Sequence, residues 1–374
     1  MAADLGTFPL GGPVPAGDVV DRADFLDRLC WELGQGHAVL LAAPRRTGKS
    51  SAALAALRRL AVTGTRTAAV DLFALASVRD LALQIADAAV TAAGGGVRVD
   101  AARAGERLAR ALAIDHVRVA LAGLEVEIFR DPARADPFEL LDRALRMPEA
   151  LAERGGTRFV LLLDEFQEAR RLGGDDLLRR LRATMQTQRL TTYLFCGSQA
   201  GVMRALFGQS RQAFYRFAYP LELPPIPDGA WRDYIAAKLG DLGRGATDAA
   251  MAVVLEATGA HPYDTMAVAS RALYLVERFG RQQVDADLAR EAVAAVEREL
   301  AVVLEAELSA MPPRAREILT HIATASPVYA ESRAPATLAR VLHGLIADGV
   351  ITRRGRGRYA IGERMLARYL AARG

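Results

Sequence analysis

The chain has 374 residues, of which 51% are hydrophobic and 25% are charged, a composition that predicts a soluble globular protein of two or three domains. Its charge is uneven along the chain. Residues 311–374 hold eleven arginines and four acidic residues, a net charge of +7, and because the whole chain carries +4, residues 1–310 sum to −3. The basic character therefore belongs to the C-terminal end.

Several classes of protein are excluded. Cys30 and Cys196 lie in apolar segments, which fits buried reduced thiols better than a disulfide framework, and the five histidines show no metal-ligand spacing. Residues 1–15 lack a basic stretch followed by an apolar one, and no apolar run is long enough to span a membrane. We expect a cytoplasmic protein that does not bind membranes.

The first predicted helix lies within residues 13–34, where Phe25, Leu26 and Leu29 have helical spacing and Asp21 near the start suits an ordinary cap. A short apolar strand, residues 38–42, follows the helix.

The loop after this strand, residues 43–50, is followed by an Ala/Leu-rich stretch that predicts a helix. Gly48, Lys49 and Ser50 match the Walker A pattern, whereas Ala43 replaces its first glycine. In such a loop, backbone N–H groups at a helix N-terminus wrap a phosphate chain, while a lysine neutralises charge and a hydroxyl binds Mg²⁺. The alternative is a chance Gly-Lys-Ser between a strand and a helix.

We therefore predict a nucleotide site with Mg²⁺ at this loop. Lys49 supports the prediction because it and Lys238 are the only lysines among 48 Lys+Arg residues, so a compact ammonium stands where the chemistry needs one. The residues predicted to contact the nucleotide here are Pro44, Arg45, Arg46, Thr47, Gly48, Lys49, Ser50 and Ser51. Ser50 is also a predicted metal ligand.

The next segments predict a strand and a helix, and then an insertion relative to a minimal P-loop core. The insertion, residues 95–135, combines a predicted helix with two alternating strands turned at Ala122-Gly123. We favour its packing over the edge of the sheet rather than contacting substrate. After the helix that follows the Walker A loop, the predicted elements are a strand at 66–72, helices at 77–93 and 101–114, strands at 117–121 and 124–129, and a helix at 137–153.

The apolar run 158–163 predicts a strand buried on both faces, and it ends in Asp164 and Glu165. This is the Walker B arrangement, in which carboxylates at the carboxyl end of a parallel strand reach the ligand crevice. Asp164 would hold Mg²⁺ through water, and Glu165 would orient the water that attacks the γ-phosphate. The alternative is a buried strand that ends in two surface acids.

Three motifs together resemble the archaeal-type ATPases, a branch of the AAA+/STAND P-loop group related to origin-recognition initiators. They are residues 43–50, Leu163-Asp164-Glu165-Phe166-Gln167 and Cys196-Gly197-Ser198. Those proteins show "GPRR-x-GK", "DEFQ" and "GSS" in the same order, and the resemblance covers most of the chain. This sequence departs from the pattern at Ala43 and at Gln199.

The resemblance implies roles for two residues near the nucleotide. The segment around Val20 would lie beside the adenine, which leaves two interpretations of residues 19–22, the other being the capped helix. Ser198 follows the predicted strand 191–196 and would act as a sensor of the γ-phosphate or the water. Its alternative role is to cap a helix over residues 199–206.

The resemblance also implies two contacts from further along the chain. Arg216, before the predicted strand 219–223, would supply an arginine finger to its own or a neighbouring subunit's nucleotide. The turn with Gly259, His261 and Pro262 would pack against the nucleotide and report its state, unless it is a simple interhelical turn.

A proline run at residues 224–227 marks the clearest boundary. The pattern beyond it is helical, with predicted helices at 231–239, 248–257, 265–279 and 284–308. The last 65 residues predict a winged helix, with a helix at 313–323, a short helix before Pro335, a third helix through Ile346, and two strands around a basic turn within 349–361.

The predicted wing carries four arginines that suit phosphate contacts. The residues predicted to contact nucleic acid are Arg340, Arg353, Arg354, Arg356 and Arg358. Specific base readout looks weaker, because the exposed positions of the third helix offer Thr337 and His343 but no Asn or Gln. Double-stranded DNA and a protein partner both remain open as ligands of this region.

The predicted fold class is α/β: a P-loop NTPase core with a parallel sheet (residues 1–224), a helical lid (225–308) and a C-terminal winged helix (309–374). The predicted function is an ATP-binding, slowly hydrolysing switch with Mg²⁺ that controls DNA binding. A signalling switch whose winged helix contacts protein is the alternative, and the resemblance allows an oligomer.

Overall fold

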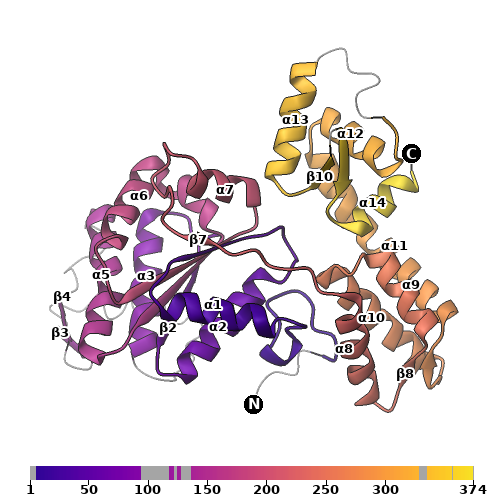
Figure 1. Ribbon diagram of the computed structural model, residues 1–374, viewed down its shortest axis with the longest axis horizontal. Helices are drawn as coiled ribbons and strands as arrows, with labels where there is room; N and C mark the ends of the chain where they lie inside the picture. Colours follow the sequence, from indigo (N-terminus) through magenta and orange to yellow (C-terminus); the bar gives the residue numbers. More distant parts are fainter. Residues whose placement is uncertain are drawn as a thin grey trace.

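A computed structural model describes residues 6–93, 118–121, 124–127, 136–327, 335–355 and 357–373. The chain forms two halves (Figure 1). One half, coloured from indigo to magenta, surrounds a β-sheet, and the other, in orange and yellow, is mainly helical.

The sheet of the first half has five parallel strands in the order β2-β5-β6-β1-β7. Their bounds are Val39–Ala42 for β1, Arg66–Asp71 for β2, Phe159–Asp164 for β5, Thr191–Gly197 for β6 and Tyr219–Pro220 for β7. Because β6 lies between β1 and β5, the loop after β1 and the acids after β5 flank the end of β6. The predicted α/β class with a parallel sheet is confirmed.

Both faces of the sheet are buried, which explains the uninterrupted apolar run of β5. Successive side chains of a strand point to opposite faces. Phe159, Leu161 and Leu163 accordingly join one core cluster, and Val160 and Leu162 join the other. The first cluster is covered by α3 (Val78–Ala93), α5 (Pro137–Gly155), α6 (Ala169–Met185) and α7 (Ala200–Gly208), and the second by α1 (Ala23–Gly34) and α2 (Lys49–Val62).

Four helices follow the proline run, and we call them the helical module. They are α8 (Asp228–Gly240), α9 (Asp248–Thr258), α10 (Pro262–Arg278) and α11 (Ala286–Ala310). Local chemistry sets two of their starts: Thr247 Oγ1 accepts from the N–H of Ala250, and Asp285 Oδ1 accepts from the N–H of Leu288. Two parallel strands of two residues each, β8 (Gly245–Ala246) and β9 (Gln283–Val284), pair the loop between α8 and α9 with the loop between α10 and α11.

Residues 312–373 form what we call the C-terminal module. Its elements are α12 (Pro313–Ala323), α13 (Pro335–Ala347), the antiparallel strands β10 (Ile351–Gly355) and β11 (Arg358–Ile361), and α14 (Arg364–Ala371). Leu304 and Leu308 of α11 belong to its core, while Met365 of α14 belongs to the core of the helical module. The two modules therefore share helices (Figure 1).

The structure differs from the sequence predictions in several elements. Helices α6 and α14 have no counterpart among the predicted elements, and β7 has two residues where five were predicted. The predicted antiparallel pair appears as β3 (Arg118–Leu121) and β4 (Leu124–Glu127). The predicted helix at 101–114, most of the insertion 95–135 and the short helix before Pro335 lie outside the described residues. The domain boundaries at 224 and 308 stay predictions.

Candidate nucleotide site

The loop between β1 and α2 presents an open helix N-terminus. Gly48 is the residue before α2 and has φ +88°, a conformation that favours glycine, and no side chain caps the helix. The first N–H groups of α2 thus lack a side-chain acceptor and suit a phosphate. Thr47 braces the loop, because its hydroxyl donates a 2.8 Å hydrogen bond to the carbonyl of Pro44.

Ala43 replaces the first glycine of the Walker A pattern, and its backbone conformation shows whether this replacement strains the loop. It is not among the residues of positive φ in the described part of the chain, so the loop begins in a conformation that any residue adopts. Its N–H donates to the carbonyl of Gly197 at 3.3 Å, and its side chain is buried. Alanine at this position therefore imposes no backbone strain.

Lys49 meets the two acids at the end of β5. Its ammonium donates a 2.6 Å hydrogen bond to Glu165 Oε1 and lies 4.0 Å from Asp164 Oδ1. The lysine is 6% exposed, so this ion pair is shielded from water. The structure thereby joins the two sequence motifs in one cluster.

Three further donors hold the other oxygen of Glu165. Ser198 donates from its N–H at 3.1 Å and from its hydroxyl at 2.6 Å, and Gln167 donates from Nε2. Burial alone would raise the pKa of Glu165, but the hydrogen bonds from Lys49, Ser198 and Gln167 outweigh it and lower the pKa to about 2. Glu165 is therefore ionised at neutral pH.

Ser198 is not a helix cap. Helix α7 begins at Ala200 after Gln199, and no side chain caps it. The hydroxyl of Ser198 is directed to Glu165 instead, and the side chain is 1% exposed. The cap interpretation was wrong because the helix starts one residue later than the cap role requires.

A cavity of about 440 Å³ adjoins the loop. This volume is in the range of small-molecule sites. Loop residues line one side, and Val20, Trp231, Pro262 and Met266 contribute to an apolar side. Phosphate-binding groups thus adjoin apolar walls suited to a base, so the cavity fits a nucleotide.

The N-terminal segment forms part of this cavity. Helix α1 begins at Ala23 after Arg22, and no side chain caps it, so the capped-helix interpretation of Asp21 was wrong. Val20 lies instead among the cavity-lining residues. Ser51 also lines the cavity, and its hydroxyl accepts a 3.1 Å hydrogen bond from the N–H of Val14.

The predicted Mg²⁺ ligands are Ser50 and Asp164, a hydroxyl and a carboxylate of the kind that this ion takes. Among the residues that the structure describes, no group of three or more His, Cys, Asp or Glu could hold a metal ion.

Two predicted residues lie apart from this cluster. Arg216 is exposed, with its guanidinium 5.3 Å from the ring centroid of Tyr215. Arg45 is exposed as well. Within the described ranges, no hydrogen bond or ion pair joins either arginine to Lys49, Asp164 or Glu165.

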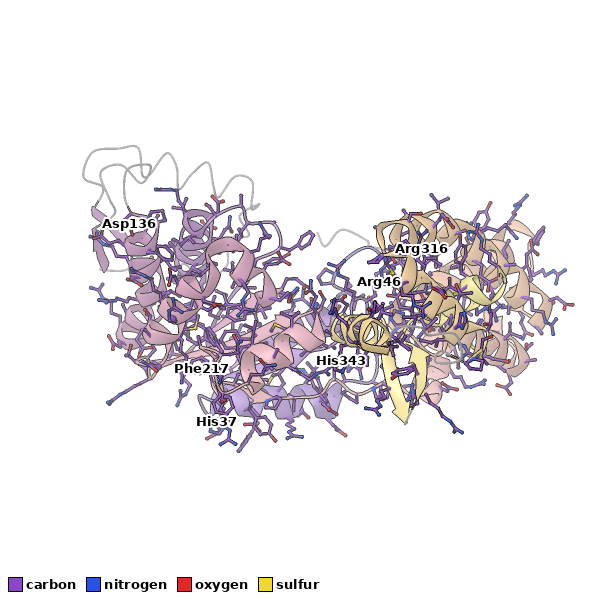
Figure 2. All side chains as sticks on the ribbon, turned by 90° about the horizontal axis from the view of Figure 1, so that it is seen from above. His37, Arg46, Asp136, Phe217, Arg316 and His343 are labelled. Atoms are coloured by element: carbon purple, nitrogen blue, oxygen red, sulfur yellow. The ribbon has the colours of Figure 1, made fainter. Side chains whose placement is uncertain are left out.

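Arg46 connects the loop to both modules. Its guanidinium lies 4.8 Å from the ring centroid of Tyr263 in α10, and Nη1 lies 4.0 Å from Oε2 of Glu363. Figure 2 shows Arg46 where the two halves meet. The neighbouring Pro44 packs against the C-terminal module, since a Cβ on Gly349 would lie 3.3 Å from its Cγ.

A second contact between the halves involves α7 and α13. A Cβ added to Gly201 would clash with the backbone of Ala347, so the end of α13 lies directly on α7. His343 of the same helix is also near the junction in Figure 2. The C-terminal module is thus docked on the phosphate-binding half at two points.

The predicted nucleic-acid contacts lie at the surface. Arg340, Arg353, Arg354 and Arg358 are exposed, and Arg356 lies outside the described residues. Arg353 donates to the carbonyl of Gly355, and none of these four exposed arginines forms an ion pair within the described part of the chain. Their charges are therefore available to a phosphate backbone.

Sequence reasoning missed three residues of this region. Asp71 pairs in register with Asp164 across β2 and β5, and burial raises its pKa. The feature of the sequence that could have identified Asp71 is its position at the carboxyl end of a predicted parallel strand. Gln167 stood in a quoted motif without a role, and Glu363 gave no signal because its partner Arg46 is remote in sequence.

Comparison with known proteins bears on the fold. No protein-family model and no curated protein matches the sequence. The Walker-type ATPase PABY2304 of Pyrococcus abyssi is similar in structure, with a TM-score of 0.72 at 18% identity over 98% of this chain and 99% of that chain. The ORC2 protein of Aeropyrum pernix, solved in ADPNP–ADP complexes, has a TM-score of 0.61 at 15% identity over 94% and 92%.

The chain has the fold of the ORC-like P-loop ATPases. The ORC1 protein of Aeropyrum pernix, solved in complex with DNA, is similar too, with a TM-score of 0.50 at 17% identity over 97% of this chain and 94% of that one. The resemblance predicted from the three motifs is confirmed for the fold, over nearly the whole length. In the described residues, no helix is both long and apolar enough for a membrane span.

Proposed function

We propose that the protein is an ATP-dependent switch, which binds Mg·ATP at the loop between β1 and α2, hydrolyses it slowly and passes its nucleotide state to the basic C-terminal module. The observation that carries the proposal is the double contact of Arg46, to Tyr263 in one module and Glu363 in the other. A phosphate in the loop competes with Glu363 for this cation, because both are anions within its reach. Binding thereby weakens one attachment of the C-terminal module.

Hydrolysis is supported by the pairing of Lys49 with Glu165. Phosphate takes over Lys49, which frees one oxygen of Glu165 to orient and polarise the attacking water. Ser198 lies at the same carboxylate and suits a sensor role. Mg²⁺, held by Ser50 and Asp164, would supply neutralisation of charge on the phosphates.

The proposed output is binding of double-stranded DNA by the C-terminal module, folded as a winged helix. Its support is the four exposed arginines, which form no ion pair within the described residues, and the structurally similar ORC1 protein, which was solved in complex with DNA. The alternative output is a protein partner. It is supported by the close packing of α13 on α7, since this helix already packs against another part of the same chain.

The test combines nucleotide binding, phosphate release and DNA binding. We expect the affinity for a labelled duplex at low salt to differ between the ATP-bound, ADP-bound and nucleotide-free states. Glu363→Gln should reduce this difference because it weakens the attachment to Arg46. The matched control is Glu317→Gln, which breaks only an ion pair with Arg314 inside α12.

Each part of the proposal has its own failure. Absence of ATP binding in the wild type would contradict the proposal of an ATP-dependent switch. Absence of duplex binding in every nucleotide state would remove the DNA output and leave the protein partner.

Two further assignments belong to this proposal. The exposed position of Arg216 fits a finger offered to a neighbouring subunit's nucleotide rather than to its own, which requires an oligomer. A cytoplasmic location fits the two cysteines, neither of which forms a disulfide.

A further inference from the structure

Gln167 is buried beside the proposed catalytic carboxylate, yet it has no role in the function described so far. It lies in the short 3₁₀ helix Phe166–Glu168 that follows β5, and it is 6% exposed. Its Nε2 donates to Glu165 Oε2 and lies 3.4 Å from Ser198 Oγ. The amide therefore touches both residues that would handle the attacking water.

The chemistry of the partners fixes which way this amide faces. An ionised carboxylate only accepts hydrogen bonds, so the NH₂ group of Gln167 must face Glu165. Its Oε1 then faces inward and finds no hydrogen-bond partner among the residues that the structure describes. A buried acceptor without a partner is unfavourable, so the contact with Glu165 is maintained against a local cost.

A glycine makes room for this orientation. A Cβ on Gly197 would lie 2.5 Å from Oε1 of Gln167 and would also clash with Met203. The end of β6 thus forms a slot in which the amide is held between Gly197 and Glu165. A side chain at position 197 would force the amide of Gln167, the side chain of Met203 or both to shift.

We propose that Gln167 is a positioning residue that, together with Ser198, anchors Oε2 of Glu165, so that Oε1 faces the attacking water once phosphate has taken Lys49. The two oxygens have separate partners: among the described residues, Oε1 accepts from Lys49 alone, and Oε2 accepts from the Ser198 and Gln167 donors. Loss of Lys49 as a partner frees Oε1 without loosening Oε2. This inference rests on the proposed hydrolysis of ATP, and it assigns the residue that orients the carboxylate.

The first test is Gln167→Leu, which removes the amide donor and puts an apolar side chain of similar size in its place. We expect kcat for ATP to fall about 10- to 100-fold, the effect of a misplaced catalytic group, while KM and ADP affinity measured by calorimetry stay within about twofold. Gly197→Ala should reproduce this split by displacing the amide. Gln186→Leu, at an exposed position at the end of α6, is the matched control and should leave both constants unchanged.

The second test needs no ATPase activity. In the nucleotide-free protein, the urea midpoints of Gln167→Leu, Glu165→Ala and the double variant should be non-additive, because truncation of Glu165 removes the carboxylate acceptor of Gln167 and leaves only the longer contact with Ser198. Additive midpoints, or an unchanged kcat in a folded Gln167→Leu protein, would overturn the inference. A wild type without ATPase activity would instead contradict the proposed function. The urea cycle would still show whether Gln167 anchors the carboxylate of Glu165.

Discussion

The ammonium of Lys49 and the carboxylate of Glu165 form a 2.6 Å hydrogen bond between residues that are 116 positions apart. Each is the residue that the sequence motifs assign to nucleotide chemistry, one to phosphate binding and the other to water activation. Because of this pairing, a phosphate that bound at Lys49 would compete with the glutamate for the ammonium.

This pairing predicts opposite effects of two substitutions on ATP affinity. Lys49→Ala should abolish both ATP binding and turnover, because it removes the cation that neutralises the phosphates. Glu165→Gln should abolish turnover but bind ATP more tightly, by up to about tenfold, since about 1.4 kcal/mol of competition corresponds to that factor. Calorimetry and phosphate release check both. Normal turnover in either variant would refute the assignment.

The arginines of β10 and β11, the proposed wing, predict a salt-dependent interaction with DNA. Reversal of charge at Arg353, Arg354 and Arg358 should weaken duplex binding and lower the slope of log affinity against log salt by about 0.9 for each phosphate that the wing no longer neutralises. A filter-binding salt series measures this slope. A triple reversal at the exposed Arg278, Arg281 and Arg290 of the helical module is the control. Equal slopes for the two triple variants would exclude the wing as the DNA-binding surface.

Ala43→Gly tests the importance of the departure from the Walker A pattern. Because Ala43 has no positive φ, glycine brings no relief of strain and adds freedom to the unfolded chain. We expect unchanged ATP affinity and a decrease of about 0.5 to 1 kcal/mol in the free energy of unfolding. Calorimetry and urea unfolding provide the two values. A large gain in ATP affinity would show that the alanine does restrict the loop.

Glu149 predicts a pH dependence of stability. It accepts hydrogen bonds from the N–H groups of Arg189, Leu190 and Thr191 at the start of β6. Burial raises the pKa of Glu149, but these bonds outweigh burial and lower the pKa below its ordinary value of 4.5. A lowered pKa stabilises the fold above the unfolded-state pKa, and this contribution disappears as the pH falls through the folded-state pKa.

Glu149→Gln should therefore reduce the free energy of unfolding at pH 7 by about 1 kcal/mol, and the difference from wild type should shrink in acid. Urea unfolding of both proteins at pH 7 and in acid measures this difference in the free energy of unfolding. Glu153→Gln, on the exposed side of the same helix, should behave as wild type at each pH. A difference that persisted in acid would mean that the charge of Glu149 is not the cause.

Much of the α/β half could be predicted because its signals are local. The apolar run 158–163 ends in two acids, and a strand buried on both faces needs no alternation to be recognised. Helix α6 escaped prediction because Gly173 and Gly174 interrupt it with non-helical backbone angles. Helix α14 carried a usable signal, since Met365, Leu366 and Leu370 have helical spacing and are buried.

The contacts within the site were harder to predict. The motifs placed Lys49, Asp164 and Glu165 at one edge of the sheet, because carboxyl ends of parallel strands meet there. The pairing of Arg46 with Glu363 depends on how two modules dock, and nothing in either local sequence encodes that geometry. Arg216 was assigned by resemblance from its place before β7, and the arginine-finger role stays a prediction.

Helix α11 has the geometry of a lever arm. It has 25 residues, so at about 1.5 Å per residue it is about 38 Å long. Val293 and Val296 lie in one core, and Leu304 and Leu308 lie in the next, so a tilt of the helix carries both modules with it. A tilt of about 10° moves the far end of a helix of that length by about 7 Å. In the proposed switch, a small change at the phosphate that tilted α11 would become a displacement as large as a helical turn at the far end of this helix.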